Sequence, residues 1–192
     1  MIELTDNNMT SNLSLENTQS TCIGNKNTDI AFYLPNPPTL PANIHYDNPH
    51  FIKQIIELNG NHWRKIVTIM AKITAHSDSA DAWRECREDL FLPSPQKLTV
   101  KLLINHTTLN PDAKLHIICG QQALEELQQH ALSKAESLNN FDINQAILHA
   151  KPIDEKQKIM AHKQVLITPY LDYRQFSNQQ ISVVRDYINK LL

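Results

Sequence analysis

A chain of 192 residues with a net charge of −2 and only three glycines, Gly24, Gly60 and Gly120, lacks the closely spaced glycines of Walker loops and dinucleotide-binding fingerprints. Residues 1–28 hold three acidic side chains and one basic side chain, so the rest of the chain is neutral overall and shows no basic excess of the kind that attracts nucleic acid. The length and the 41% hydrophobic content suit one globular domain, and no apolar run is long enough to span a membrane.

The amino-terminal residues 1–28 are rich in Asn, Thr and Ser and show neither helical nor strand periodicity. We therefore expect a disordered tail over residues 1–28, in which Gly24 has no role, and a single α/β domain over residues 29–192. The amino terminus has no apolar core for secretion, and three widely spaced cysteines do not form a disulfide framework. These features predict a cytoplasmic protein without membrane contact.

The first half of the expected domain contains a strand and three helices. Residues 29–34 are apolar and end at prolines, which is typical of a strand that leads into a stiff loop. Asn48 predicts a helix start, and Gly60 predicts a break at positive φ before a second helix capped by Asn61. A weaker helical pattern covers residues 79–90.

The second half contains two strand-to-helix units. Residues 98–104 alternate like a half-buried strand, and residues 115–119 form an apolar strand that leads into a helix. Residues 133–162 are polar and poorly periodic, which predicts irregular structure with one or two helical turns. Residues 165–167 indicate an interior strand, and residues 177–180 match a capping box before the last helix.

Two such units favour a three-layer α/β sandwich in which a mainly parallel central sheet of about four strands is flanked by helices. In sheets of this kind, ligands bind where loops leave the carboxyl ends of the strands. Three loops meet this condition, namely residues 35–41, 119–122 and 169–176.

The loop after the last strand is the richest of the three in ligand-binding side chains, which are Tyr170, Asp172, Tyr173, Arg174 and Gln175. Aromatic rings beside a guanidinium suit the stacking of a base. In the alternative, structural interpretation the tyrosines seal the end of the sheet and Asp172 pairs with Arg174.

Two helix starts supply further candidates for ligand binding. Asn61, His62 and Arg64 begin the second helix, a position that favours anions. The alternative is that His62 is a half-buried, hydrogen-bonded residue and that Arg64 belongs to a solvated face. Gly120 and Gln121 begin the helix that follows the second unit's strand, and they are also candidates.

Cysteine and histidine spacing does not predict metal binding. No His-Glu-x-x-His or Cys-x-x-Cys motif is present, and His116 and Cys119 are expected on opposite faces of one strand. Cys119 precedes a helix start, where a thiol pKa can be lowered, but a lone strand cysteine is more typical of the core. We predict no metal and no cofactor.

Two segments resemble the signature segments of an uncharacterised family of small bacterial proteins, a domain of unknown function. They are residues 60–65 (GNHWRK) and residues 168–176 (TPYLDYRQF). This resemblance covers about residues 29–192 and implies no activity.

The order of three motifs is similar to that of uracil-DNA glycosylase-like folds. Residues 34–37 (LPNP) resemble the Asn-Pro motif of the mismatch-specific branch, residues 118–123 (ICGQQA) resemble the glycine-to-helix unit, and residues 168–174 take the place of the last motif. This resemblance implies that Asn36 positions a water and that Tyr170 donates a hydrogen bond to a flipped base. Prolines replace the glycines that flank Asn-Pro in that family, and Tyr170 stands where it has a histidine.

The leading hypothesis is a catalytically degenerate relative of uracil-DNA glycosylases that binds a base, a nucleotide or DNA. Its site combines Asn36, the loop at residues 170–175 and the helix start at residues 61–64. One alternative is an active base-excision glycosylase, a hydrolase with Asn36, Tyr170 and Asp172 as catalytic candidates. The other is a protein-interaction module with no small-molecule site.

Overall fold

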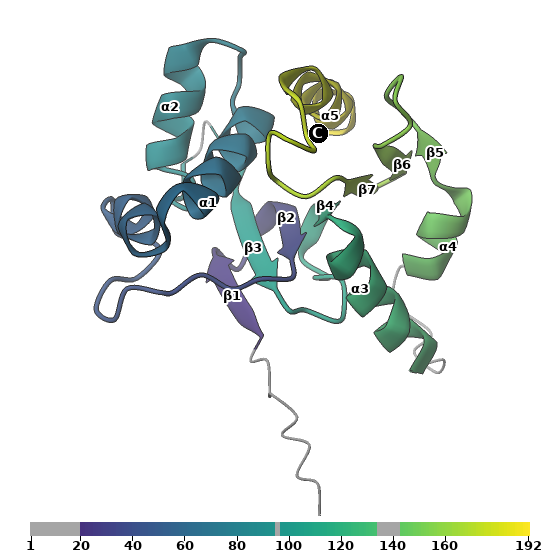
Figure 1. Ribbon diagram of the computed structural model, residues 1–192, viewed down its shortest axis with the longest axis horizontal. Coiled ribbons are helices and arrows are strands. Elements are labelled where there is room, and N and C mark those ends of the chain that lie inside the picture. The colour runs from purple at the N-terminus through teal and green to yellow at the C-terminus, as the bar shows by residue number, and fades with distance from the viewer. Residues whose placement is uncertain (1–19, 95–96, 134–142) are drawn as a thin grey trace, which may run out of the picture.

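The computed structural model describes residues 20–94, 97–133 and 143–192 of the chain (Figure 1). These residues form one sheet and the helices that cover it. The strands are β1 (Thr21–Gly24), β2 (Thr28–Leu34), β3 (Val100–Ile104), β4 (Ala113–Cys119), β5 (Lys151–Pro152), β6 (Met160–His162) and β7 (Val165–Thr168). The helices are α1 (Phe51–Thr74), α2 (Ala80–Glu88), α3 (Gln121–Ser133), α4 (Ile143–His149) and α5 (Asn178–Leu191).

The sheet within the described residues has seven strands in the order β1-β3-β2-β4-β7-β6-β5. The pairings among β3, β2, β4 and β7 are parallel, whereas β1, β6 and β5 are added in antiparallel pairings. The α/β class is confirmed, but the expectation of about four mainly parallel strands is wrong. The sheet is larger and mixed, because three strands of two to four residues each extend it at its edges.

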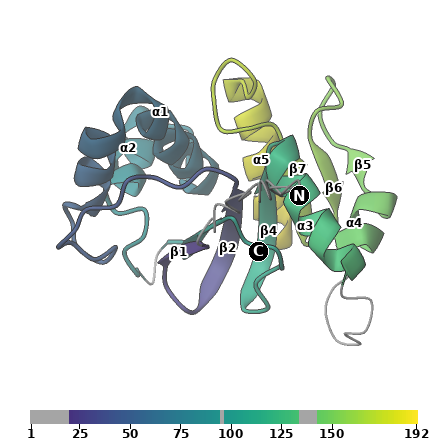
Figure 2. The same cartoon turned by 60° about the horizontal axis from the view of Figure 1, so that its bottom comes forward.

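Helices cover both faces of the sheet, as Figures 1 and 2 show. On one face, α1 and α5 pack against the larger core, which includes Phe32, Ile66 and Ile188, and α2 packs on α1. On the other face, α3 and α4 pack over a smaller core that includes Tyr33 and Leu127. Phe32 and Tyr33 are neighbours in β2 and face opposite cores, as the pleat of a strand requires.

The segment at residues 21–28 belongs to the sheet, so the expected tail over residues 1–28 is wrong at its carboxyl end. Thr21–Gly24 pair with β3, and the side-chain amide of Asn25 donates a hydrogen bond of 3.3 Å to the Phe91 carbonyl. A strand of four residues shows too little alternation to be detected in a polar sequence. Residues 1–19 lie outside the described residues.

A kink at Gly60 divides α1, as its sequence predicted. The φ of Gly60 is 67° and its ψ is −150°, a conformation that glycine adopts without steric cost. The first half starts at Phe51, and Asn48 accepts a hydrogen bond from the His50 amide just ahead of it. The Asn61 side chain accepts hydrogen bonds from the Arg64 guanidinium at 2.6 and 3.0 Å. The kink turns the second half of α1 so that its buried face lies on the sheet.

Residues 143–162 are more regular than predicted. They contain α4 and the β5–β6 hairpin, which joins the sheet through β7. The seven residues of α4 agree with the predicted one or two helical turns. The prediction missed the two strands, because strands of two and three residues are defined by their partners rather than by periodicity. The part of that prediction that covers residues 134–142 lies outside the described residues.

Candidate functional site

A pocket of about 510 Å³ opens at the carboxyl ends of β4 and β7. Its apolar side chains come from α3, α4 and the two strands β6 and β7, and they are Leu124, Ile147, Met160 and Ile167. Its polar side chains are Gln121, Lys158, Thr168, Tyr170, Arg174 and Gln175. Both charged side chains in this lining are basic, so the pocket combines a largely apolar lining with Lys158 and with Arg174, whose charge is paired with that of Asp172.

Gly120 allows the Tyr170 ring to lie against the end of β4. The φ of Gly120 is 91°, and a Cβ at this position would lie 3.3 Å from Tyr170 Cβ and Cδ2. The Gly120 amide donates a hydrogen bond of 2.9 Å to the Thr168 carbonyl, which continues the pairing of β4 with β7 into the loop. α3 begins at the next residue, Gln121, so the positive end of its dipole lies at the pocket.

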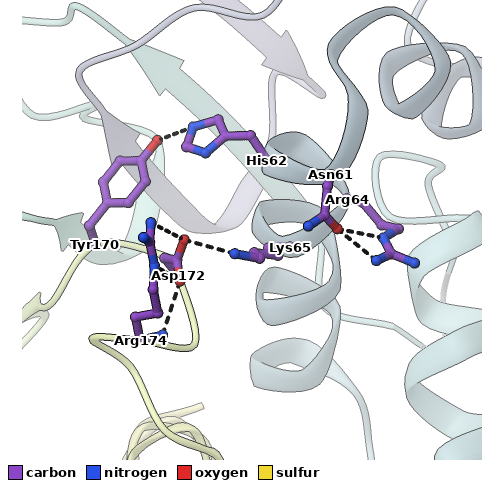
Figure 3. Close-up of polar contacts among 7 residues, drawn as sticks. All are labelled: Asn61, His62, Arg64, Lys65, Tyr170, Asp172 and Arg174. Carbon is purple, nitrogen blue, oxygen red and sulfur yellow. Dashed lines mark hydrogen bonds and ion pairs between the residues drawn. The ribbon is translucent and has the colours of Figure 1, made fainter.

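The Tyr170 hydroxyl connects the pocket to α1. It lies 2.9 Å from His62 Nε2, and the two rings stack with centroids 5.7 Å apart and planes inclined by 14° (Figure 3). Burial raises the pKa of Tyr170, while the Asn36 side chain beside it acts in the opposite direction. The phenol therefore stays protonated at neutral pH and keeps a donor. The structure thus brings Asn36, His62 and Tyr170 together.

Asp172 is buried beneath the same loop, where it organises the backbone. Only 4% of its side chain is exposed, and it pairs with Lys65 of α1 at 3.1 Å and with the Arg174 guanidinium at 3.1 and 3.2 Å (Figure 3). The Arg174 amide also donates to it at 3.0 Å. These donors, with Arg174 first, hold the pKa of Asp172 far below its usual value. The pairing of Asp172 with Arg174 is therefore confirmed, and the carboxylate is a weak proton acceptor.

The remaining predicted residues lie away from the pocket. Asn61 and Arg64 bond to each other and point away from the loop in Figure 3. Tyr173 packs on the opposite side of the loop, where its ring lies 5.0 Å from Lys72 Nζ. Cys119 is fully buried, and burial raises its pKa to about 12, so this thiol is not a nucleophile at neutral pH.

Sequence reasoning missed Lys158 and assigned Lys65, like Arg64, to a solvated face. Lys158 lines the pocket from the β5–β6 hairpin, a segment without a periodic signal. Lys65 reaches Asp172 across 107 positions of sequence. The sequence held one signal for Lys65: it follows His62 by three residues, so the two side chains lie on the same face of the predicted helix.

We expect Asp172→Asn to lower the free energy of unfolding by about 2 kcal/mol, because it leaves the partly buried Lys65 without a counter-ion. Urea unfolding followed by circular dichroism measures this loss. Asp81→Asn is the matched control, since Asp81 is fully exposed in an ion pair with Arg84 and its loss should cost less than about 0.5 kcal/mol. Equal midpoints for both variants would show that the buried pairing contributes nothing.

The structure offers neither a membrane-spanning helix nor a cluster of metal ligands within the described residues. None of the helices in residues 20–94, 97–133 and 143–192 has both the length and the apolar character needed to cross a bilayer. In the same residues, no three His, Cys, Asp or Glu side chains gather in a way that could hold a metal ion.

Comparison with known proteins places the chain in a family. No curated protein and no solved structure matches it. Residues 21–189 match the Family of unknown function (DUF6942), a match that begins at β1 and ends within α5. The predicted resemblance to a domain of unknown function is confirmed by this match. The chain belongs to the family of unknown function DUF6942.

Proposed function

We propose that the protein binds a nucleotide or an unpaired nucleic-acid base in the pocket between β4, β7 and α3, as a catalytically degenerate relative of uracil-DNA glycosylases. The observation that carries this proposal is the composition of the pocket, whose lining is largely apolar and whose charged side chains are both basic. An apolar lining suits a planar base, and basic side chains suit a phosphate.

The polar side chains of the rim fit the two ends of such a ligand. Gln121, Tyr170 and Gln175 supply the neutral donors and acceptors that the edge of a base requires. Lys158 and Arg174, together with the amino terminus of α3, supply positive charge for a phosphate. Arg174 is 81% exposed although it is paired, so its guanidinium also faces solvent.

The position of three motifs supports the relation to glycosylases. Asn36 follows β2, Gly120 follows β4 and Tyr170 follows β7, and these strands are neighbours in the sheet. Segments whose order resembles the glycosylase motifs therefore meet at one edge. The degenerate character is supported by Asp172, whose two oxygens are occupied by donors.

Titration calorimetry with the four ribonucleoside 5′-monophosphates tests the binding proposal. At least one should bind, and Lys158→Gln should weaken it about ten-fold, because a charge-assisted hydrogen bond contributes roughly 1.5 kcal/mol. Lys156→Gln is the matched control, since Lys156 is exposed on the same hairpin but does not line the pocket. The absence of binding to all four, or equal losses in both variants, would contradict the proposal.

Base excision is the second candidate, and the contact between Asn36 and Tyr170 favours it. The resemblance assigns these two residues to the water and to the base. Incubation with a uracil-containing duplex should then produce abasic sites, and Asn36→Ala should abolish them. If no abasic sites form while nucleotides still bind, the protein is a binding protein without this activity.

A further inference from the structure

Aromatic rings and basic side chains gather where α1, α2 and the loop after β7 meet. Lys72 Nζ lies 5.1 Å from the centroid of the Trp83 ring and 5.0 Å from that of the Tyr173 ring. Arg84 and Arg87 also lie over Trp83, at 5.0 and 5.9 Å. We call these five residues the basic–aromatic cluster. It lies outside the pocket, and the proposed function does not use it.

The charge of Lys72 has no anionic partner among the ion pairs of the described residues. Its ammonium donates a hydrogen bond of 2.9 Å to the neutral Asn178 side chain and otherwise lies against the two rings. Cation–π contacts stabilise an ammonium without neutralising it. Lys72 therefore presents a fixed, uncompensated positive charge.

The two arginines of the cluster pair with acidic neighbours on the same helix. Arg84 lies 3.5 Å from Asp81, and Arg87 lies 2.7 Å from Glu88. Asp81 is fully exposed and Glu88 is about half exposed, and ion pairs at such positions contribute little. A phosphate can replace these partners at low cost, while the Trp83 ring keeps the guanidinium groups in place.

The loop after β7 lies between the cluster and the pocket and contributes a residue to each. Tyr173 faces the cluster, and the next residue, Arg174, faces the pocket. Lys65, two turns before Lys72 on α1, fixes this loop through Asp172. A ligand in the pocket has to pass around this loop, by way of Arg174 and Tyr173, to reach Lys72.

We infer that the basic–aromatic cluster binds the phosphate backbone of a single-stranded nucleic acid whose terminal or unpaired base occupies the pocket. This inference rests on the proposed function and makes a strand, rather than a free nucleotide, the ligand. Grooves for single strands combine basic side chains along the backbone with aromatic rings. The neutral overall charge of the domain requires such a local patch, because bulk attraction is missing.

Fluorescence anisotropy with a labelled oligothymidylate of about 12 nucleotides, compared with thymidine 5′-monophosphate, tests the inference. The oligonucleotide should bind at least about ten-fold more tightly than the monophosphate. Its binding constant K should fall with salt, and Lys72→Gln should reduce the slope of log K against log salt by about 0.7. The same variant should weaken oligonucleotide binding about five-fold. It should leave binding of the monophosphate unchanged, and Lys72→Arg should restore the wild-type affinity.

Two controls separate this inference from a general charge effect. Lys190→Gln removes an exposed lysine about 18 Å along α5 from Asn178 and should change neither affinity nor slope. Inorganic polyphosphate, which has no bases, should bind more weakly than oligothymidylate or oligouridylate. Quenching of Trp83, identified by its loss in Trp83→Phe, should accompany oligonucleotide binding.

The outcomes distinguish this inference from the proposed function. Equal affinity for the oligonucleotide and the monophosphate, an unchanged salt slope in Lys72→Gln, or equal binding of polyphosphate would overturn the inference and leave nucleotide binding intact. No binding of either thymidine ligand, together with no binding of any ribonucleoside monophosphate, would remove the proposed function itself.

Discussion

Gly24→Ala is expected to lower the free energy of unfolding by about 3 kcal/mol, although the change adds a single methyl group. The φ of Gly24 is 118°, a conformation that residues with a Cβ rarely adopt. A Cβ at this position would lie 2.4 Å from the Val100 carbonyl oxygen and 3.0 Å from Lys101 Cα. Both neighbours are backbone atoms of β3, so the steric clash can be relieved only if the pairing of β1 with β3 shifts.

Chemical denaturation with urea measures this effect, and Gly60→Ala is the matched control. Gly60 also has a positive φ, at 67°, but a Cβ there would meet no atom within 4 Å. Its φ and ψ fall in a region that is essentially reserved for glycine, so alanine should cost backbone strain of about 2 kcal/mol but no clash. Equal losses in the two variants would show that β1 yields easily and that the close approach to β3 contributes nothing.

Stability is expected to fall by about 3 kcal/mol between pH 7 and pH 4 because of His116 alone. This side chain is 5% exposed in β4, and burial lowers its pKa from 6.5 to about 4. The Tyr33 hydroxyl accepts a hydrogen bond from the Asn110 amide at 2.8 Å and shares a hydrogen bond of 2.9 Å with His116 Nδ1. The imidazole is thus held in its neutral form.

The sign of this effect follows from proton binding. Below pH 6.5 the unfolded chain takes up a proton at His116 while the folded protein does not, so acid favours unfolding until the pH reaches about 4. Urea unfolding at several pH values should show a shallower decline in His116→Asn, whose side chain can share a hydrogen bond with Tyr33 but takes up no proton. The carboxylates titrate alike in both proteins and cancel in the comparison. Parallel pH profiles would contradict the prediction.

The sequence predicted those parts of the fold that local patterns determine. Residues 177–180 form the expected capping box, with Ser177 and Gln180 bonded to each other's backbone, and Gly60 kinks α1 as its position indicated. The four strands that contain apolar runs, β2, β3, β4 and β7, were located to within two residues at each end. The strands β1, β5 and β6 were not, because their structure depends on partners that lie far away in the sequence.

The candidate site was predictable to a similar degree. The rule that ligands bind at the carboxyl ends of parallel strands indicated Gly120, Tyr170 and Arg174, which all line the pocket. It could not indicate Lys158, which comes from a hairpin outside the parallel strands. Nor could it separate Asn61 and Arg64 from His62, because the direction of each side chain depends on how α1 is rotated against the loop.

The position of β7 has a consequence for synthesis on the ribosome. β7 is the last strand in the sequence, yet it lies inside the sheet between β4 and β6. One side of β4 therefore has unpaired backbone groups until residues 165–168 have emerged and inserted. Unpaired edges of this kind promote association between nascent chains. The pocket is incomplete until then, since the part of its wall that contains Tyr170 arrives with this strand.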